Sequence, residues 1–97
     1  MTLHQINRPH YTSPVERDWL LSLQDGDSVL LFESGVLRSL KANPTMTGLS
    51  IDKSVTLYVR SCDVKAHGLS VDESVYTIID DNQWLELTAS CERIISW

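Results

Sequence analysis

The sequence has little basic charge and no long apolar run. Its 97 residues include eight Lys and Arg against thirteen Asp and Glu, so the formal net charge is −5. Direct nucleic-acid binding depends on clustered Lys and Arg, so we do not expect it here. No stretch approaches the roughly 20 apolar residues of a membrane-spanning helix, and the first ten residues show no apolar signal region. These absences predict one soluble, cytoplasmic domain over residues 1–97.

Cysteine and histidine are also scarce. The two cysteines, Cys62 and Cys91, are too few for a disulfide scaffold and too far apart for a CxxC unit. The three histidines have no i, i+3 or i, i+4 spacing, so we expect no metal site. The pair Asp80-Asp81 could bind a cation, but helix capping by Asp80 explains it without one.

Short β-like runs alternate with short helix-like runs along the chain. Strands are predicted at residues 3–7, 29–32, 55–59, 75–79 and 93–97. Helices are predicted from Ser13 to Gly26, over residues 36–40 and 61–68, and from a second capping box at Asp80 and Gln83. The dipeptide Asn43-Pro44 ends the second helix, and residues 45–53 are predicted to be a polar loop.

This alternation predicts an α/β fold: a small, doubly wound, mainly parallel five-stranded sheet with short helices on both faces. We expect the flavodoxin-like strand order 2-1-3-4-5. In the first helix, Ser13 is the predicted N-cap and Glu16 completes the capping box, and Ser61 is the predicted cap of the helix at residues 61–68. Helices this short cannot cover both faces of five strands, so the uncovered apolar surface indicates that the domain works in a complex.

The loops after the predicted strands carry little chemistry. Residues 7–13 contain no glycine, which argues against a phosphate cradle, and Arg8 stands where a phosphoacceptor domain needs acidic residues. Cys62 falls in the first turn of a helix, where a thiolate could be stabilised, and is the one candidate reactive thiol. The alternative is that Cys62 only fills space beside Asp63, with Arg60 and Lys65 as the nearby bases.

Five other side chains have plainer interpretations. His10 could act as a base but is more typical of a solvated loop residue. Trp19, Trp84 and Cys91 fall on helix faces that turn inward. Trp97, at the last position, is expected to be exposed unless it lies in an interface. Residues 72–92 hold six acidic residues and no Lys or Arg, a solvated face that would repel RNA.

Four stretches make the chain resemble the TusB/DsrH family of DsrE-like sulfur-transfer proteins. They are LHQINR at residues 3–8, GDSVLLFESGV at 26–36, Tyr58-Val59 followed by DVKAHGL at 63–69, and the final Trp97. The resemblance spans nearly the whole chain and implies a DsrE-like fold. Some DsrH-type members carry a cysteine in the first helix, where this chain has Trp19.

The resemblance also implies a function and partners. It implies a non-catalytic structural subunit, without cofactor, in a TusBCD-like heterohexamer with TusC-like and TusD-like subunits. Persulfide sulfur would pass from a TusA-like donor, through the TusD-like subunit, to a TusE-like acceptor and then to the 2-thio group of the tRNA wobble uridine. The isolated chain could instead form a homo-oligomer.

Three alternatives stay open. The first is a DsrH-type subunit in intracellular sulfur oxidation, with the same fold and partners. The second is a thiol sulfurtransferase that uses Cys62. The third is a homo-oligomeric binder of a small ligand, for which the sequence offers neither a glycine-rich loop nor a charged pocket.

Overall fold

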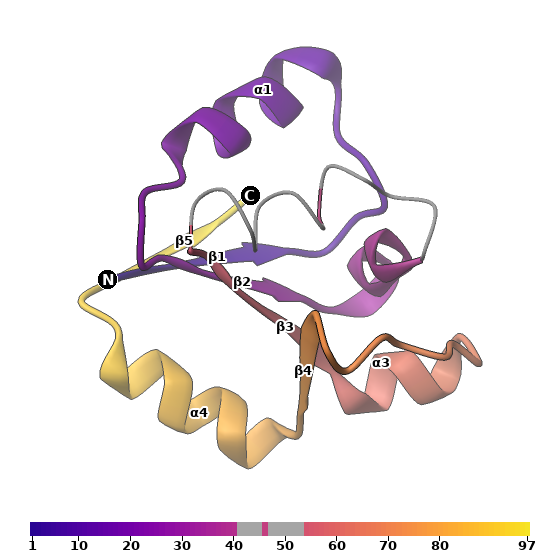
Figure 1. The fold of residues 1–97 in the computed structure, drawn as a ribbon. Coiled ribbons are helices and arrows are strands. Elements are labelled where there is room, and N and C mark those ends of the chain that lie inside the picture. Colours follow the sequence, from indigo (N-terminus) through magenta and orange to yellow (C-terminus); the bar gives the residue numbers. More distant parts are fainter. Residues whose placement is uncertain (41–45, 47–53) are drawn as a thin grey trace.

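A computed structural model describes residues 1–40, 46 and 54–97 and shows a sheet flanked by short helices (Figure 1). The predicted helix break at Asn43-Pro44 and all of the predicted loop at 45–53 except Met46 lie outside the described residues. The elements, in chain order, are β1 (Thr2–Ile6), α1 (Ser13–Ser22), β2 (Ser28–Leu31), the 3-10 helix η1 (Glu33–Ser39), β3 (Thr56–Arg60), α3 (Ser61–Ala66), β4 (Tyr76–Ile79), α4 (Asp81–Ser90) and β5 (Arg93–Ser96).

The five strands form one sheet in the order β4-β3-β2-β1-β5, and every neighbouring pair is parallel. The predicted parallel α/β sheet is confirmed. The predicted order 2-1-3-4-5 is wrong. Alternation of strands and helices fixes the strand direction but not the side to which each strand is added. Here three successive connections step in one direction from β1 to β4, and only the last returns to place β5 beyond β1.

The direction of these steps decides which face each helix covers. Because crossovers between parallel strands are right-handed, the three connections that step alike place their helices on one face. Trp19 of α1, Val36 of η1 and Val64 of α3 accordingly join one buried cluster with Val29 and Val59 of the sheet. The last connection steps the other way, and Figure 1 shows α4 on the side of the sheet opposite α1.

The face under α4 is less completely covered. Its cluster has three buried members, Leu3, Leu30 and Ile79, with Trp84 and Leu87 of α4 only half-buried. No residue of α4 is fully buried, and the side chain of Leu85 is 71% exposed. The prediction of helices on both faces is confirmed, and among the described elements one 10-residue helix covers this second face.

Two predicted N-caps are wrong, although α1 begins at Ser13 and α3 at Ser61 as expected. The N-cap of α1 is Thr12 rather than Ser13, and its side chain makes no capping hydrogen bond. Glu16 does not form the predicted capping box, because its carboxylate instead accepts hydrogen bonds from the Tyr11 backbone N–H and from Arg38. The N-cap of α3 is Arg60 rather than Ser61, again without a side-chain bond.

Other local predictions have mixed outcomes. Asp80 caps α4 with the full predicted box: the Gln83 N–H donates to the Asp80 carboxylate at 2.8 Å, and the Asp80 N–H donates to the Gln83 side chain at 2.9 Å. Gly68 follows the end of α3 and takes the left-handed conformation, with φ +63°. Gly26 is also left-handed, but α1 ends at Ser22, so Gly26 serves the turn before β2. The helix predicted at 36–40 is η1, which begins at Glu33.

Gly35 is required where η1 crosses β1. A Cβ atom at this position would overlap the carbonyl oxygen of Ile6. The Phe32 N–H donates to that same carbonyl oxygen at 3.1 Å, and the Gly35 N–H donates to the Phe32 carbonyl at 2.9 Å. The glycine therefore lets η1 lie directly against the carboxyl end of β1, where the candidate site begins.

Candidate functional site

The strand order locates the topological switch point of the sheet at β1 and β5. The chain leaves β1 toward α1 on one face and reaches β5 from α4 on the other. In open α/β sheets, ligands bind outside the carboxyl ends of the strands at such a point. The carboxyl ends of β1 and β5 carry Asn7, the loop to Tyr11, and Trp97. These residues define the candidate site.

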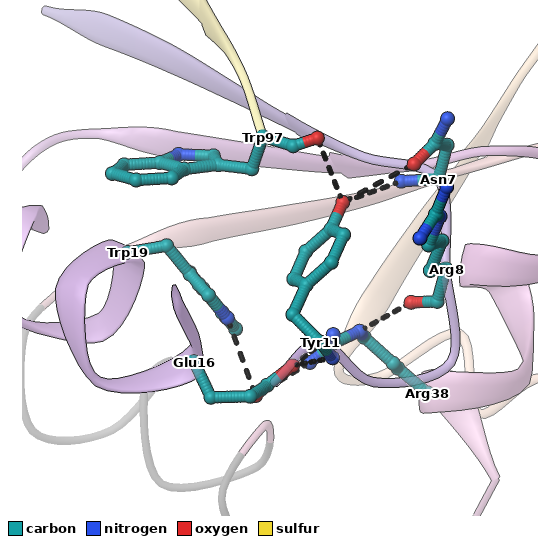
Figure 2. Close-up of polar contacts among 7 residues, drawn as sticks. All are labelled: Asn7, Arg8, Tyr11, Glu16, Trp19, Arg38 and Trp97. Atoms are coloured by element: carbon teal, nitrogen blue, oxygen red, sulfur yellow. Dashed lines mark hydrogen bonds and ion pairs between the residues drawn. The ribbon is translucent and has the colours of Figure 1, made fainter. Parts of the chain in front are cut away.

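Tyr11 connects the two strand ends (Figure 2). Its hydroxyl donates to the carbonyl oxygen of Trp97 and lies 3.2 Å from it. The Asn7 N–H donates to the same hydroxyl at 3.2 Å, and the Asn7 side-chain oxygen lies at the same distance. The loop after β1 is thus fixed to Trp97, the residue that follows β5.

A buried ion pair lies under this loop. The Arg38 side chain of η1 is 4% exposed and forms two hydrogen bonds to the carboxylate of Glu16. Its Nε donates to the Arg8 carbonyl at 2.8 Å, and its guanidinium lies over the rings of Tyr11 and Trp19, 5.2 and 5.3 Å from their centres. Arg38 therefore holds α1, η1 and the loop in one arrangement, as Figure 2 shows.

The ion pair also sets the protonation of Glu16. Burial alone would raise the pKa of the Glu16 carboxyl, because it disfavours the charged form. Hydrogen bonds from Arg38 and the Tyr11 N–H, together with the charge of Arg38, hold that pKa below its ordinary value. The indole of Trp19 adds a fourth hydrogen bond to this carboxylate, at 3.3 Å. Glu16 is therefore a structural anion rather than a base.

The loop also borders a hollow of about 460 Å³, lined by Arg8, His10, Tyr11, Thr12 and Val15. Arg8 and His10 are both exposed, which confirms the prediction of a solvated His10. Among the residues that the structure describes, no carboxylate pairs with the Arg8 guanidinium, whereas Arg38 is fully engaged. The charge at the mouth of the hollow is therefore positive, in a chain whose net charge is negative.

A second buried polar group supports the site from within the sheet. His4 is 1% exposed, and its Nε2 lies 3.1 Å from a carboxylate oxygen of Asp27. The indole N–H of Trp97 donates to His4 Nδ1 at 3.1 Å. Because an indole can only donate, Nδ1 accepts and Nε2 carries the proton, so His4 is held as one neutral tautomer. The expectation of an exposed Trp97 is wrong: it is half-buried against the α1-side cluster.

Asp27 receives several hydrogen bonds in this arrangement. Its burial would raise its pKa, but the bond from His4 and those from the backbone N–H groups of Gln24 and Thr2 outweigh burial and lower the pKa. The His4, Asp27 and Trp97 side chains thus tie the end of β5 to the beginning of β2. This connection holds Trp97 in place, and the Trp97 carbonyl in turn accepts the hydrogen bond from Tyr11 in the candidate site.

Cys62 lies elsewhere on the carboxyl edge of the sheet. Its exposed thiol borders a hollow of about 300 Å³ together with Ser61, Asp80, Asp81 and Asn82. Arg60 is the base nearest in sequence, but it donates to Asp81 at 2.8 Å and lies 3.4 Å from Asp63. Those hydrogen bonds raise the pKa of Arg60 and lower the pKa of Asp81. The cationic charge beside Cys62 is therefore already neutralised, and a reactive thiolate needs an electropositive setting.

The remaining predicted residues are accounted for by structure. Cys91, the C-cap of α4, is half-buried rather than buried and packs against the same buried cluster as Trp84. Asp80 caps α4 and Asp81 pairs with Arg60, so neither needs a cation. In the described part of the chain, no group of three His, Cys, Asp or Glu side chains could hold a metal ion. No helix there is long and apolar enough to cross a membrane.

Sequence reasoning missed His4, Asp27 and Arg38. A histidine inside a predicted strand, between Leu3 and Ile6, is a signal that a buried polar group needs a partner. No local sequence pattern predicts the buried ion pair of Arg38, because its partner Glu16 lies 22 residues earlier and was assigned to a capping box.

The fold and this edge define a small parallel α/β protein of the DsrE-like class. The crystal structure of the YchN protein from E. coli superposes with a TM-score of 0.71, covering 99% of this chain and 97% of that one, at 14% sequence identity. That likeness shows the fold. The family model described as DsrH like protein matches residues 12–94.

The sequence relatives agree with the family model. Protein TusB of Salmonella typhimurium is 31% identical over 98 aligned residues, which cover 98% of this chain and 99% of that protein. Protein TusB of Salmonella arizonae matches to the same extent. The chain belongs to the DsrH family, and the resemblance seen in the sequence is confirmed.

Proposed function

We propose that this chain is a non-catalytic subunit of a TusBCD-like sulfur-relay complex, in which related subunits pass persulfide sulfur toward 2-thiolation of the tRNA wobble uridine. The observation that carries the proposal is the full-length match to TusB proteins within the DsrH family. The relay, its TusC-like and TusD-like partners and the tRNA product are what that relationship implies for the chain.

The two residues that could carry sulfur argue for a supporting role. Trp19 takes the place of the first-helix cysteine of some DsrH-type members, and it is fully buried under Arg38. Cys62 is accessible, but carboxylates surround it and engage its nearby arginine. A thiol in that setting lacks the cationic partner that stabilises a thiolate.

A subunit without a reacting group can still raise the rate of transfer by holding its partners in place. Correct positioning of two reactants replaces much of the entropy cost of their encounter. The fixed loop from Asn7 to Tyr11, tied to Trp97 and Arg38, is a rigid feature at the edge where this fold class places its sites. It is suited to hold a partner rather than to react.

Assembly tests the proposal directly. The chain is co-expressed with the TusC-like and TusD-like chains of the same genome, and the purified material is analysed by size-exclusion chromatography with light scattering. We expect a stable heteromer that contains all three chains. A chain that stays separate from both partners, or that forms only a homo-oligomer beside them, contradicts the proposal.

Transfer RNA analysis separates the two metabolic roles. We expect a deletion strain to lose 2-thiouridine from bulk tRNA and to regain it with the wild-type gene or with Cys62→Ser. Unchanged 2-thiouridine, with defective sulfur oxidation, favours the DsrH-type role instead.

Transfer by Cys62 itself is the second candidate, favoured by the exposure of its thiol in the 300 Å³ hollow. The protein is incubated with a persulfide donor and its intact mass is measured. A gain of one sulfur atom in wild type but not in Cys62→Ser, together with failed rescue by that variant, would assign the transfer to Cys62. We expect neither result.

A further inference from the structure

The hollow of about 460 Å³ beside the loop after β1 has the size of a small-molecule site. Such sites commonly measure about 300–1,000 Å³, so this hollow has room for more than a single ion. The loop leaves the carboxyl end of β1, at the switch point where this fold class places its ligands. The proposed subunit role assigns no ligand to it.

Three side chains with hydrogen-bond donors line this hollow. Arg8 contributes a guanidinium, His10 an imidazole and Thr12 a hydroxyl. All three residues are exposed. In the part of the chain that the structure describes, none of these three side chains has a hydrogen-bond or ion-pair partner. Their donors are therefore available to a ligand.

The positive charge of the hollow is not cancelled by its walls. None of the described residues that line it is Asp or Glu. Glu16, the acidic residue nearest to them in sequence, gives its carboxylate to Arg38 and to the backbone N–H of Tyr11. Arg8 therefore keeps its charge at the mouth of the hollow, and an anionic group is the complementary ligand.

The backbone that carries these donors is already held in place. The Nε of Arg38 donates to the Arg8 carbonyl at 2.8 Å, and the Tyr11 N–H donates to Glu16 at 2.6 Å. Between these two anchored points, the ring of Pro9 fixes one backbone dihedral angle. A site whose backbone is ordered before binding loses less conformational entropy when its ligand arrives.

The number of donor groups favours a phosphate monoester among anions. Its three terminal oxygens and its charge of about −1.5 to −2 at pH 7 match three donor groups, one of which is a guanidinium that binds phosphate through two parallel hydrogen bonds. A carboxylate offers two oxygens and one charge. The phosphodiester of a nucleic acid also has two free oxygens, and a chain of net charge −5 repels a polyanion.

We propose that this hollow binds a small molecule through a phosphate monoester group. Arg8 binds the phosphate, and His10 and Thr12 are the further donors. The organic part of the molecule lies against Tyr11 and Val15, which are half-buried and complete the described wall of the hollow. The inference is independent of the proposed function, because binding needs no partner subunit and no sulfur transfer.

The experiment titrates the isotope-labelled full chain and follows its backbone amide signals by NMR, with chloride keeping the ionic strength constant. Phenyl phosphate is the main probe, benzoate carries the same ring on a carboxylate, and inorganic phosphate lacks the ring. We expect saturable shifts centred on residues 8–15. Benzoate should bind about tenfold more weakly, because it forms fewer charge-assisted hydrogen bonds. Inorganic phosphate should bind about fivefold more weakly, because it leaves the apolar wall uncovered.

Two charge-matched variants locate the bound probe. Arg8→Gln and Arg93→Gln each remove one exposed arginine, but Arg93 lies at the amino end of β5, at the opposite edge of the sheet. We expect Arg8→Gln to weaken binding of phenyl phosphate about tenfold, because a charge-assisted hydrogen bond is lost. Arg93→Gln should leave the affinity unchanged. Thr12→Val keeps the shape of the side chain without its hydroxyl and should weaken binding about threefold.

The contrary results overturn the inference in different ways. Shifts that never saturate, or equal effects of Arg8→Gln and Arg93→Gln, show only a general attraction of anions. Benzoate of equal affinity shows that the hollow does not select phosphate, and inorganic phosphate of equal affinity shows that it does not bind the ester.

Stability and assembly are measured beside the titrations. Because the Arg8 side chain has no partner among the described residues, Arg8→Gln should keep the urea midpoint of the wild-type chain. A lower affinity at an unchanged midpoint then reports the lost contact rather than unfolding. Assembly of the wild-type chain with the related subunits tests the proposed function separately, so either proposal can fail without the other.

Discussion

The indole N–H of Trp97 donates to Nδ1 of His4, 93 residues earlier in the chain, at a distance of 3.1 Å. The two rings are nearly parallel, at an interplanar angle of 11° with centroids 6.3 Å apart. This contact joins β1 to the residue that follows β5, and the Trp97 carbonyl then accepts from Tyr11. The buried core of the sheet and the loop of the candidate site are connected through one residue.

Trp97→Phe tests that connection. The substitution keeps an aromatic ring but removes the one donor to His4 Nδ1 among the described residues, which leaves a buried acceptor unsatisfied. Such a loss costs about 1–3 kcal/mol, so we expect the free energy of unfolding in urea to fall by that amount. Ser96→Ala removes only the exposed bond from Gln5 and should cost less than about 0.5 kcal/mol. Equal effects of the two substitutions would contradict the role of the His4 contact.

Acid should destabilise the protein through Asp27 and Glu16. Both carboxyl pKa values lie below their ordinary values of 3.8 and 4.5 in the folded state. The unfolded state therefore binds more protons between the folded and ordinary pKa values. Stability is fully present above about pH 5 and is lost as pH falls through the folded pKa values.

The measurement is urea unfolding at several pH values from 6 to 2.5. Asp27→Asn removes one of the two carboxyls, so the decline of stability below the ordinary aspartate pKa should be shallower in this variant than in wild type. Curves that run parallel would show that Asp27 contributes no linkage.

Local patterns predicted the elements better than their arrangement. The strand at residues 29–32 is a continuous apolar run because β2 is buried on both faces, so its existence could be predicted from composition alone. The capping box at Asp80 and Gln83 involves residues three apart and was also visible. The position of β5 beyond β1 could not be predicted from local patterns. The edge of the sheet to which the last strand is added depends on which side of β1 completes the core.

The candidate site was predictable only in its location. The rule that sites lie at carboxyl strand ends led to the loop after β1. It could not show that Arg38 would fill the space beneath that loop, because that contact joins separate elements. The box assigned to Ser13 and Glu16 failed for the same reason: the bond from Arg38 to Glu16 is worth more than a local cap.

Gly35→Ala should be among the most destabilising single substitutions in the chain. The added Cβ would overlap the Ile6 carbonyl, which is backbone of β1 and cannot move aside cheaply. We expect a loss of about 3 kcal/mol, the upper end for overpacking. Gly68→Ala is the control, because its Cβ would meet open space and only its φ of +63° costs energy, about 1 kcal/mol. If thermal or urea unfolding ranks Gly68→Ala as the more harmful substitution, the close approach of η1 to β1 is wrong.

The ion pair between Arg38 and Glu16 should behave as a unit. Glu16→Gln leaves the guanidinium of Arg38 buried without its counter-charge, and breaking a buried pair from one side costs about 3–5 kcal/mol. Because the Glu16 side chain is 25% exposed, we expect the lower end of that range. Arg38→Met instead leaves the Glu16 carboxylate without its counter-charge, while the methylene groups of the new side chain still pack against Tyr11 and Trp19.

The double variant Glu16→Gln with Arg38→Met removes both charges, so it should be less destabilised than the sum of the single variants by about 1–3 kcal/mol. That coupling energy is measured by urea unfolding of all four proteins. The same four proteins are then compared for assembly with the related subunits. If the pair only supports the loop from Asn7 to Tyr11, assembly should weaken in step with lost stability. Additive stability effects would show that Arg38 and Glu16 act independently, and the rigid loop would then need another source of support.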